Sequence, residues 1–132
     1  MINVLVGGNA TGATLVLDAP ISFWGGVSPE TGTIIEKRHP QFNANLKGKI
    51  LMLPAAKGSS SGSSVLAEIL RNGCGPAAII LGSPDAILAT GAMVAEALYG
   101  KACPVLCVDQ DLFQKLAMAH NLKITGAEIL AS

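Results

Sequence analysis

Residues 50–71 read ILMLPAAKGSSSGSSVLAEILR and predict a strand, a Gly/Ser loop and a helix in succession. Ile50–Leu53 is a continuous apolar run, typical of a strand that is buried on both faces. After the loop, apolar residues recur with the spacing of one helix face, at Val65, Leu66, Ile69 and Leu70. We expect Ser63 or Ser64 to be the N-cap, with Arg71 and then Gly73 closing the helix.

The loop Lys57–Ser64 is the leading candidate for a binding site. Its backbone N–H groups and hydroxyls lie at the predicted N-terminus of a helix, where the helix dipole favours an anion. A carboxylate or a phosphate suits such a site, and a serine there can be a reactive alkoxide if its pKa is lowered. The loop does not have the G-x-x-x-x-G-K-[ST] spacing of a nucleotide-binding P-loop.

The remaining pattern predicts a single α/β domain over residues 1–132. Buried-type strands are expected at 77–81 and 104–108, and helices at 86–99 and 110–121. Branched residues predict further strands at 13–18 and 33–36, with a closing strand near 123–130. The first half therefore reads mainly as β-structure and the second half alternates, which indicates a sheet, β-barrel-like in one reading, with helices packed on it.

Composition excludes several classes of function. The net charge is zero and 4% of the residues are aromatic, which argues against nucleic-acid binding. No apolar run approaches the ~18 residues of a membrane span, and no signal peptide is visible. Half of the residues are hydrophobic, which suggests a surface buried against a partner. The three cysteines, at 74, 103 and 107, lack metal-site spacing and indicate buried, reduced thiols in the cytoplasm.

Three other features are candidates for the site. Lys37-Arg38-His39-Pro40 is either a solvated turn or places Arg38 or His39 at an anionic substrate or a partner. Ile21–Val27 is either a hydrophobic lid over the core or a loop that a ligand or another backbone approaches. Asp18 either orients a cation, such as Lys57 or Arg38, or caps a turn.

Long motifs give the chain a family resemblance. DAPISFWGGV at 18–27, PETG at 29–32, RHP at 38–40 and KGSSSGSSVL at 57–66 resemble the small subunit of aconitase X, in the same order and over nearly the whole chain. The resemblance implies the swivelling domain of aconitase, a β/β/α barrel or sandwich, as a separate polypeptide. It also implies a heteromeric hydro-lyase, active only with a large subunit that holds an iron–sulfur cluster, while this chain holds no metal.

The resemblance further implies a substrate and a set of roles. Bacterial members with this loop resemble cis-3-hydroxy-L-proline dehydratases, whose product is Δ1-pyrroline-2-carboxylate, whereas archaeal relatives resemble mevalonate 5-phosphate dehydratases. The Gly-Ser-Ser-Arg loop of aconitase places its serine base on Ser59, but its arginine is Ser61 here. The residues expected to bind substrate are Lys57, Gly58, Ser60, Ser61, Gly62, Ser63, Arg38 and His39.

Two alternatives remain open. The chain could be a non-catalytic module that only stabilises the large subunit. It could also serve hydration or isomerisation of another small carboxylate, as in leucine biosynthesis, although the absence of the loop arginine argues against this.

Overall fold

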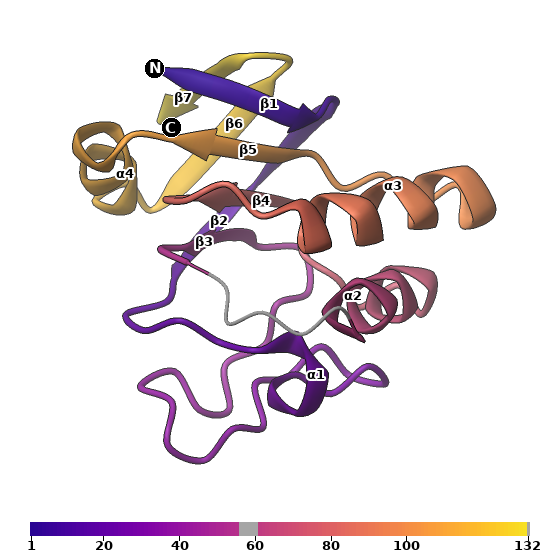
Figure 1. Cartoon of the computed structure of the whole chain (residues 1–132). Coiled ribbons are helices and arrows are strands. Elements are labelled where there is room, and N and C mark those ends of the chain that lie inside the picture. Colours follow the sequence, from indigo (N-terminus) through magenta and orange to yellow (C-terminus); the bar gives the residue numbers. More distant parts are fainter. Residues whose placement is uncertain (56–60, 132) are drawn as a thin grey trace.

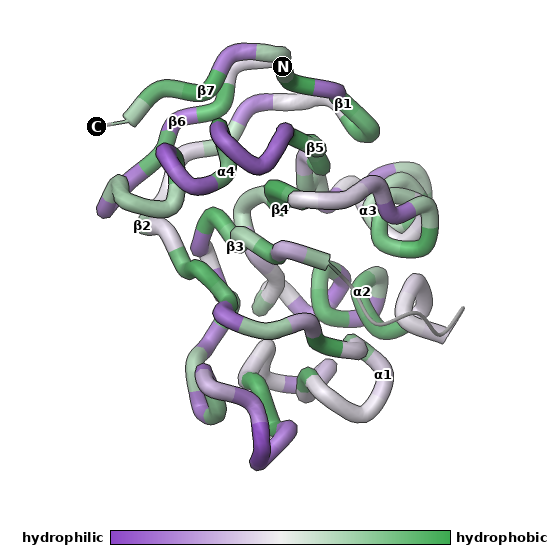
Figure 2. The backbone as a smooth tube through the Cα atoms, turned by 60° about the vertical axis from the view of Figure 1, so that its left-hand side comes forward, coloured by the Kyte–Doolittle hydropathy of each residue, from purple (hydrophilic) through white to green (hydrophobic). Residues whose placement is uncertain are grey.

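Three short, wholly apolar stretches form the centre of the sheet. They are β3 (Ile50–Leu53), β4 (Ala78–Leu81) and β5 (Val105–Val108), and every residue in them is buried. Because side chains alternate along a strand, each strand serves two hydrophobic cores. Leu51, Ile79 and Val105 lie in one core, and Met52, Ile80 and Leu106 lie in the other. Hydrophobic residues run along all three strands (Figure 2).

The computed structural model describes residues 1–55 and 61–131. The sheet has the order β1-β5-β4-β3-β2-β6-β7. Its outer strands are β1 (Ile2–Val6), β2 (Asn9–Val16), β6 (Asn121–Thr125) and β7 (Glu128–Ala131). Strands β2, β3, β4 and β5 are parallel, whereas β1 and the β6–β7 hairpin pair antiparallel at the two edges. The α/β prediction is confirmed, in the form of a curled half-barrel sheet with helices.

The helices cover both faces of the sheet. α2 (Ser61–Arg71) and α3 (Ala86–Tyr99) lie side by side on one face, and α4 (Gln110–Ala117) lies on the other (Figure 1). Asp85 caps α3 by accepting hydrogen bonds from the N–H groups of Ile87 and Leu88, and Gly100 ends it in the left-handed conformation. Within the described residues, no helix is long and apolar enough to cross a bilayer.

One predicted strand is missing, and the predicted end of the last helix is wrong. Residues 33–36 form only single bridges, Val27 with Ile34 and Thr33 with Asn45. They belong to a long excursion, residues 17–49, that contains only the short helix α1 (Phe23–Gly26). The last helix ends at Ala117 rather than Asn121, because Asn121 already pairs in β6 with Ala13.

The helix pair α2–α3 packs without a side chain at its closest point. A Cβ at Gly91, in the middle of α3, would lie 2.6 Å from the Ser63 carbonyl oxygen and 3.1 Å from the Ser63 Cα. Such a contact is too short for any residue other than glycine. Gly91 therefore sets how closely α3 approaches the first described turn of α2.

Replacement of Gly91 with Ala is expected to destabilise the fold. Alanine favours a helix by about 1 kcal/mol over glycine, but the clash with Ser63 costs more, so we expect a net loss of about 1–2 kcal/mol. Urea denaturation of Gly91→Ala measures the loss. Thr90→Ala, at an exposed neighbouring position, is the control, and its change is expected to stay within about 0.5 kcal/mol. A more stable Gly91→Ala would contradict the close contact.

The three cysteines are buried and free, as the sequence indicated. Burial raises the pKa of the Cys74 and Cys107 thiols, and it raises the pKa of Cys103, which is 1% exposed, to about 12. The folded protein therefore keeps the Cys103 thiol protonated in a pH range where the unfolded chain ionises it.

This difference predicts a loss of stability in alkali. Above pH 9.0, the ordinary pKa of the thiol, the unfolded state binds fewer protons than the folded state. The free energy of unfolding should then fall by up to about 1.4 kcal/mol per pH unit until pH approaches the folded pKa. Urea denaturation at a series of pH values tests this, with Cys103→Ala expected to decline less steeply. Equal slopes for the two proteins would refute the assignment to Cys103.

Candidate functional site

The Gly/Ser loop joins the carboxyl end of β3 to α2. The carboxyl ends of β2, β3, β4 and β5 all lie at this edge, because the four strands are parallel. In open α/β sheets this is the edge at which ligands bind. Lys57, Gly58, Ser59 and Ser60 lie outside the described residues, so the structure reports on Ser61, Gly62 and Ser63 and on what surrounds them.

The first described turn of α2 is held between two other helices. Gly62 is buried, and a Cβ there would lie 3.6 Å from Ile87 Cγ2 in α3 and 3.9 Å from the Cβ of Phe23 in α1. Ser61 is exposed and Ser63 is half-buried. The predicted N-cap at Ser63 or Ser64 is wrong, because the chain is already helical at Ser61. Ser61 and Ser63 therefore belong to the helix itself rather than to the loop before it.

The aromatic pair in α1 divides between core and surface. Phe23 is 2% exposed and belongs to the core, whereas Trp24 is 62% exposed. Trp24 lines an open hollow of about 330 Å³ together with Ser61, Ser64 and Val65. Phe23 thus closes the core, as the lid interpretation predicts, whereas Trp24 lies open beside the start of α2. The approach of a ligand to this segment stays a prediction.

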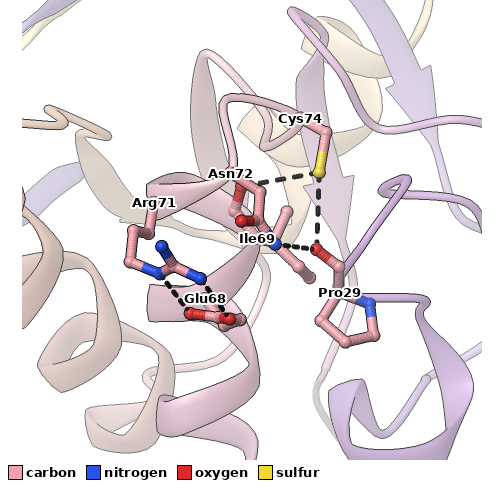
Figure 3. A network of polar contacts seen from close by, with 6 residues as sticks. All are labelled: Pro29, Glu68, Ile69, Arg71, Asn72 and Cys74. Carbon is pink, nitrogen blue, oxygen red and sulfur yellow. Dashed lines mark hydrogen bonds and ion pairs between the residues drawn. The ribbon is translucent and has the colours of Figure 1, made fainter.

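A single carbonyl fastens the α1 segment to the other end of α2. The Pro29 carbonyl oxygen accepts a hydrogen bond from Asn72 Nδ2 at 2.8 Å and from Cys74 Sγ at 3.6 Å (Figure 3). Nearby, Arg71 makes a two-pronged ion pair with Glu68, at 2.6 and 2.7 Å. The hydrogen bond from Arg71 lowers the pKa of the Glu68 carboxyl. Glu68 also lines the hollow beside Trp24, and its carboxylate there is already paired with Arg71.

In the cationic turn 37–40, the neighbours Arg38 and His39 have different environments. Arg38 is exposed, and its side chain has no ion pair within the described part of the chain. His39 is only 5% exposed, and both of its ring nitrogens are used. Nε2 donates to the Ala19 carbonyl oxygen at 2.9 Å, and Nδ1 accepts from the Gln41 N–H at 3.0 Å. His39 therefore ties the 39–41 turn to the segment after β2 and does not present its ring to a ligand.

Gln41 continues this connection to Asp18. Its Nε2 donates to Asp18 Oδ2 at 2.6 Å, and its Oε1 accepts from the Asp18 N–H at 2.9 Å. Gln41 thus orients the Asp18 side chain, because it bonds both the backbone N–H and the carboxylate of Asp18. The sequence offered no sign of this role for Gln41.

A cavity of about 380 Å³ opens at the carboxyl edge of the sheet. Its walls come from the ends of three parallel strands, β2, β3 and β4, and from α4: Val16, Leu17, Asp18, Pro54, Gly82, Ser83, Gln110, Phe113 and Gln114. Sequence analysis missed all of these except Asp18. One signal could have found them, because each segment lies at the end of a predicted strand or soon after it, and the ends of parallel strands meet at one edge.

The described residues do not offer a metal site. Within residues 1–55 and 61–131, no three or more His, Cys, Asp or Glu side chains are grouped to hold a metal ion. The three thiols are buried, with raised pKa values, which disfavours the thiolate form that ligates metals. The described part of this chain therefore does not fit an iron–sulfur cluster.

Comparison with known proteins gives a consistent family match. The family model described as aconitase X swivel domain matches residues 2–131. The cis-3-hydroxy-L-proline dehydratase of Pseudomonas aeruginosa is 45% identical over 113 residues, which cover 86% of this chain and 19% of that protein. The chain thus spans about a fifth of the length of the dehydratases of this name that it matches.

Two further relatives are similar in length or in fold. The phosphomevalonate dehydratase small subunit of Methanocella arvoryzae is 47% identical over 90 residues, which cover 68% of each protein. The crystal structure of Thermococcus kodakaraensis aconitase X in its holo-form matches with a TM-score of 0.78 and 32% identity, over 97% of this chain and 95% of that one.

The buried position of His39 predicts a structural phenotype. In His39→Ala, the Ala19 carbonyl loses its donor and the Gln41 N–H loses its acceptor, so we expect the free energy of unfolding to fall by about 1–3 kcal/mol. His120→Ala is the matched control, because that side chain is exposed, and it should change stability by less than about 0.5 kcal/mol. Urea denaturation compares the two, and equal stability of both variants would show that His39 is not fixed as described.

Proposed function

Because this chain belongs to the aconitase X swivel domain family, we propose that it is the small part of a dehydratase acting on a small hydroxy acid. The substrate that we propose is cis-3-hydroxy-L-proline. The observation that carries this choice is the 45% identity, over 86% of the chain, to a relative of that name. The geometry supports it, since a ligand-sized cavity opens at the carboxyl edge of the sheet, and Pro54, at the end of β3, lines it.

We assign the base to Ser59. As an alkoxide, its Oγ removes the proton from the carbon that bears the substrate carboxylate. The neighbouring C–O bond then breaks, and the hydroxyl group leaves with a proton as water. The resulting enamine takes up a proton on its β-carbon, loses the proton on its ring nitrogen, and so becomes Δ1-pyrroline-2-carboxylate. A free serine is too weak an acid for this role, so its anion must be stabilised by groups around it.

The groups that we assign to the stabilisation of the Ser59 anion belong to the loop and to the start of α2. Lys57 supplies a positive charge, and backbone N–H groups at the start of α2 favour an anion there. We propose that the substrate carboxylate is held by Lys57, Gly58, Ser60, Ser61, Gly62 and Ser63, with Arg38 as a second cation. His39 belongs behind this site, because its ring nitrogens both bind the backbone.

The proposed enzyme is complete only with a second component. We propose an aconitase X large subunit as the partner, and the name of the M. arvoryzae relative, a small subunit, supports a division of this kind. We assign the iron–sulfur cluster of the proposed enzyme to that subunit, and the absence of a metal-ligand group among the described residues of this chain supports the assignment. We place the enzyme in the cytoplasm, in keeping with three free thiols.

A specific observation favours one alternative substrate. The 47% identity to a phosphomevalonate dehydratase small subunit makes mevalonate 5-phosphate the second candidate. Co-expression with a large subunit, followed by anaerobic purification and assay on both compounds, separates the two. A module that serves assembly alone would instead give variants of the loop that alter assembly and leave turnover unchanged.

The role of Ser59 has a direct test. Ser59→Ala should lower kcat of the assembled enzyme by at least about a thousandfold, because the proton at carbon has no other base. Gel filtration with the partner checks that assembly is intact. Ser28→Ala is the control, as its hydroxyl donates a hydrogen bond to Glu30, and its kcat should be unchanged. Near-normal turnover of an assembled Ser59→Ala enzyme would remove Ser59 from the mechanism.

A further inference from the structure

The cavity at the carboxyl edge is lined in part by Asp18, an exposed carboxylate that the proposed mechanism does not use. Its volume of about 380 Å³ lies within the range of about 300–1,000 Å³ that is usual for small-molecule sites. Val16, Leu17 and Phe113 give it apolar walls, whereas Asp18, Gln110 and Gln114 give it polar groups. The described residues that line it include no Lys, Arg or His.

Asp18 is held in place before any ligand arrives. Gln41 bonds both its Oδ2 and its N–H, and His39 in turn bonds the Gln41 N–H and the Ala19 carbonyl oxygen. Because His39 is buried, this connection is anchored in the protein interior. A carboxylate that is oriented in this way loses little conformational freedom when it binds a ligand.

The groups that line the cavity favour a cationic ligand over an anionic one. A carboxylate beside apolar walls attracts an ammonium group through a charge-assisted hydrogen bond and repels a phosphate. The amide groups of Gln110 and Gln114 can bond either charge, so among the described residues that line the cavity it is Asp18 that decides the preference. The apolar walls suit the methylene groups of a small ring.

We propose that Asp18 binds the ring ammonium of a cyclic amino acid in this cavity and thereby determines substrate class. The inference rests on the proposed dehydration of cis-3-hydroxy-L-proline and deepens it, since the ring nitrogen of that substrate is cationic at neutral pH. Asp18 is a specificity-determining residue in this account, separate from the base. It favours a cyclic amino acid over a phosphorylated hydroxy acid.

Ligand titration of the chain itself tests the binding. In two-dimensional NMR, L-proline at millimolar concentrations should shift the backbone amide signals of Asp18, Gly82, Gln110 and Gln114 saturably. Tetrahydrofuran-2-carboxylate has the same ring and carboxylate but no ammonium group, and it should give no saturable shift. Asp18→Asn keeps an acceptor for Gln41 but loses the charge, and should weaken proline binding at least about tenfold.

Asp111→Asn is the matched control, because Asp111 is exposed on α4 and does not line the cavity. It should bind proline as the unaltered chain does. Equal proline binding by Asp18→Asn and the unaltered chain overturns the proposal, as does the absence of saturable shifts in these amides.

Kinetics of the assembled enzyme separate this inference from the proposed function. If both hold, Asp18→Asn raises KM for cis-3-hydroxy-L-proline by about 10–100-fold and changes kcat by less than about threefold. Turnover with an unchanged KM in Asp18→Asn overturns the role of Asp18 alone. Proline binding that depends on Asp18, in an enzyme that does not dehydrate hydroxyproline, overturns the proposed function alone.

Discussion

The close contact between α2 and α3 at Gly91 decides where the candidate site lies. The Ser63 carbonyl faces the bare Cα of Gly91, and Gly62, one residue earlier, packs against Ile87 and Phe23. The first described turn of α2 is therefore fixed from its buried side. The positions of the exposed Ser61 and Ser64 follow from this packing, so the contact between two helices orients the serines of the candidate site.

The central strands and α3 were predictable because their signals are local. A wholly apolar run such as Ile50–Leu53 has few alternatives to a strand buried on both faces, and Asp85 and Gly100 mark the ends of α3. Residues 33–36 show the limit of this reasoning. They have strand-forming residues, but a strand also needs a continuous partner, and Val27 and Asn45 each supply only one bridge. The availability of a partner is a property of the tertiary structure.

The site was predictable in one part only. The Gly/Ser loop stands out in the sequence, whereas the cavity is lined by segments near residues 16, 54, 82 and 110, which only the strand order brings together. His39 shows a second limit. As part of a cationic cluster it suggested a ligand, but its neighbours Ala19 and Gln41 offer an acceptor and a donor in the interior. A sequence does not reveal such pairing.

Part of the candidate site comes from the excursion over residues 17–49, which lies outside the regular strands of the sheet. Thr14 in β2 pairs with Ile50 in β3, so the chain leaves the sheet and returns to the adjacent strand. Since each doubling of a loop costs only about 0.6 kcal/mol, such a segment tolerates insertion and exchange. It carries Asp18, which lines the cavity, Trp24, which lines the smaller hollow, and Gln41, which bonds Asp18. Substitutions at the exposed positions of this segment can therefore alter the site while the strands and α2 keep their places, whereas its buried side chains, such as Ile21, Phe23 and Ile34, belong to the core and are constrained by packing.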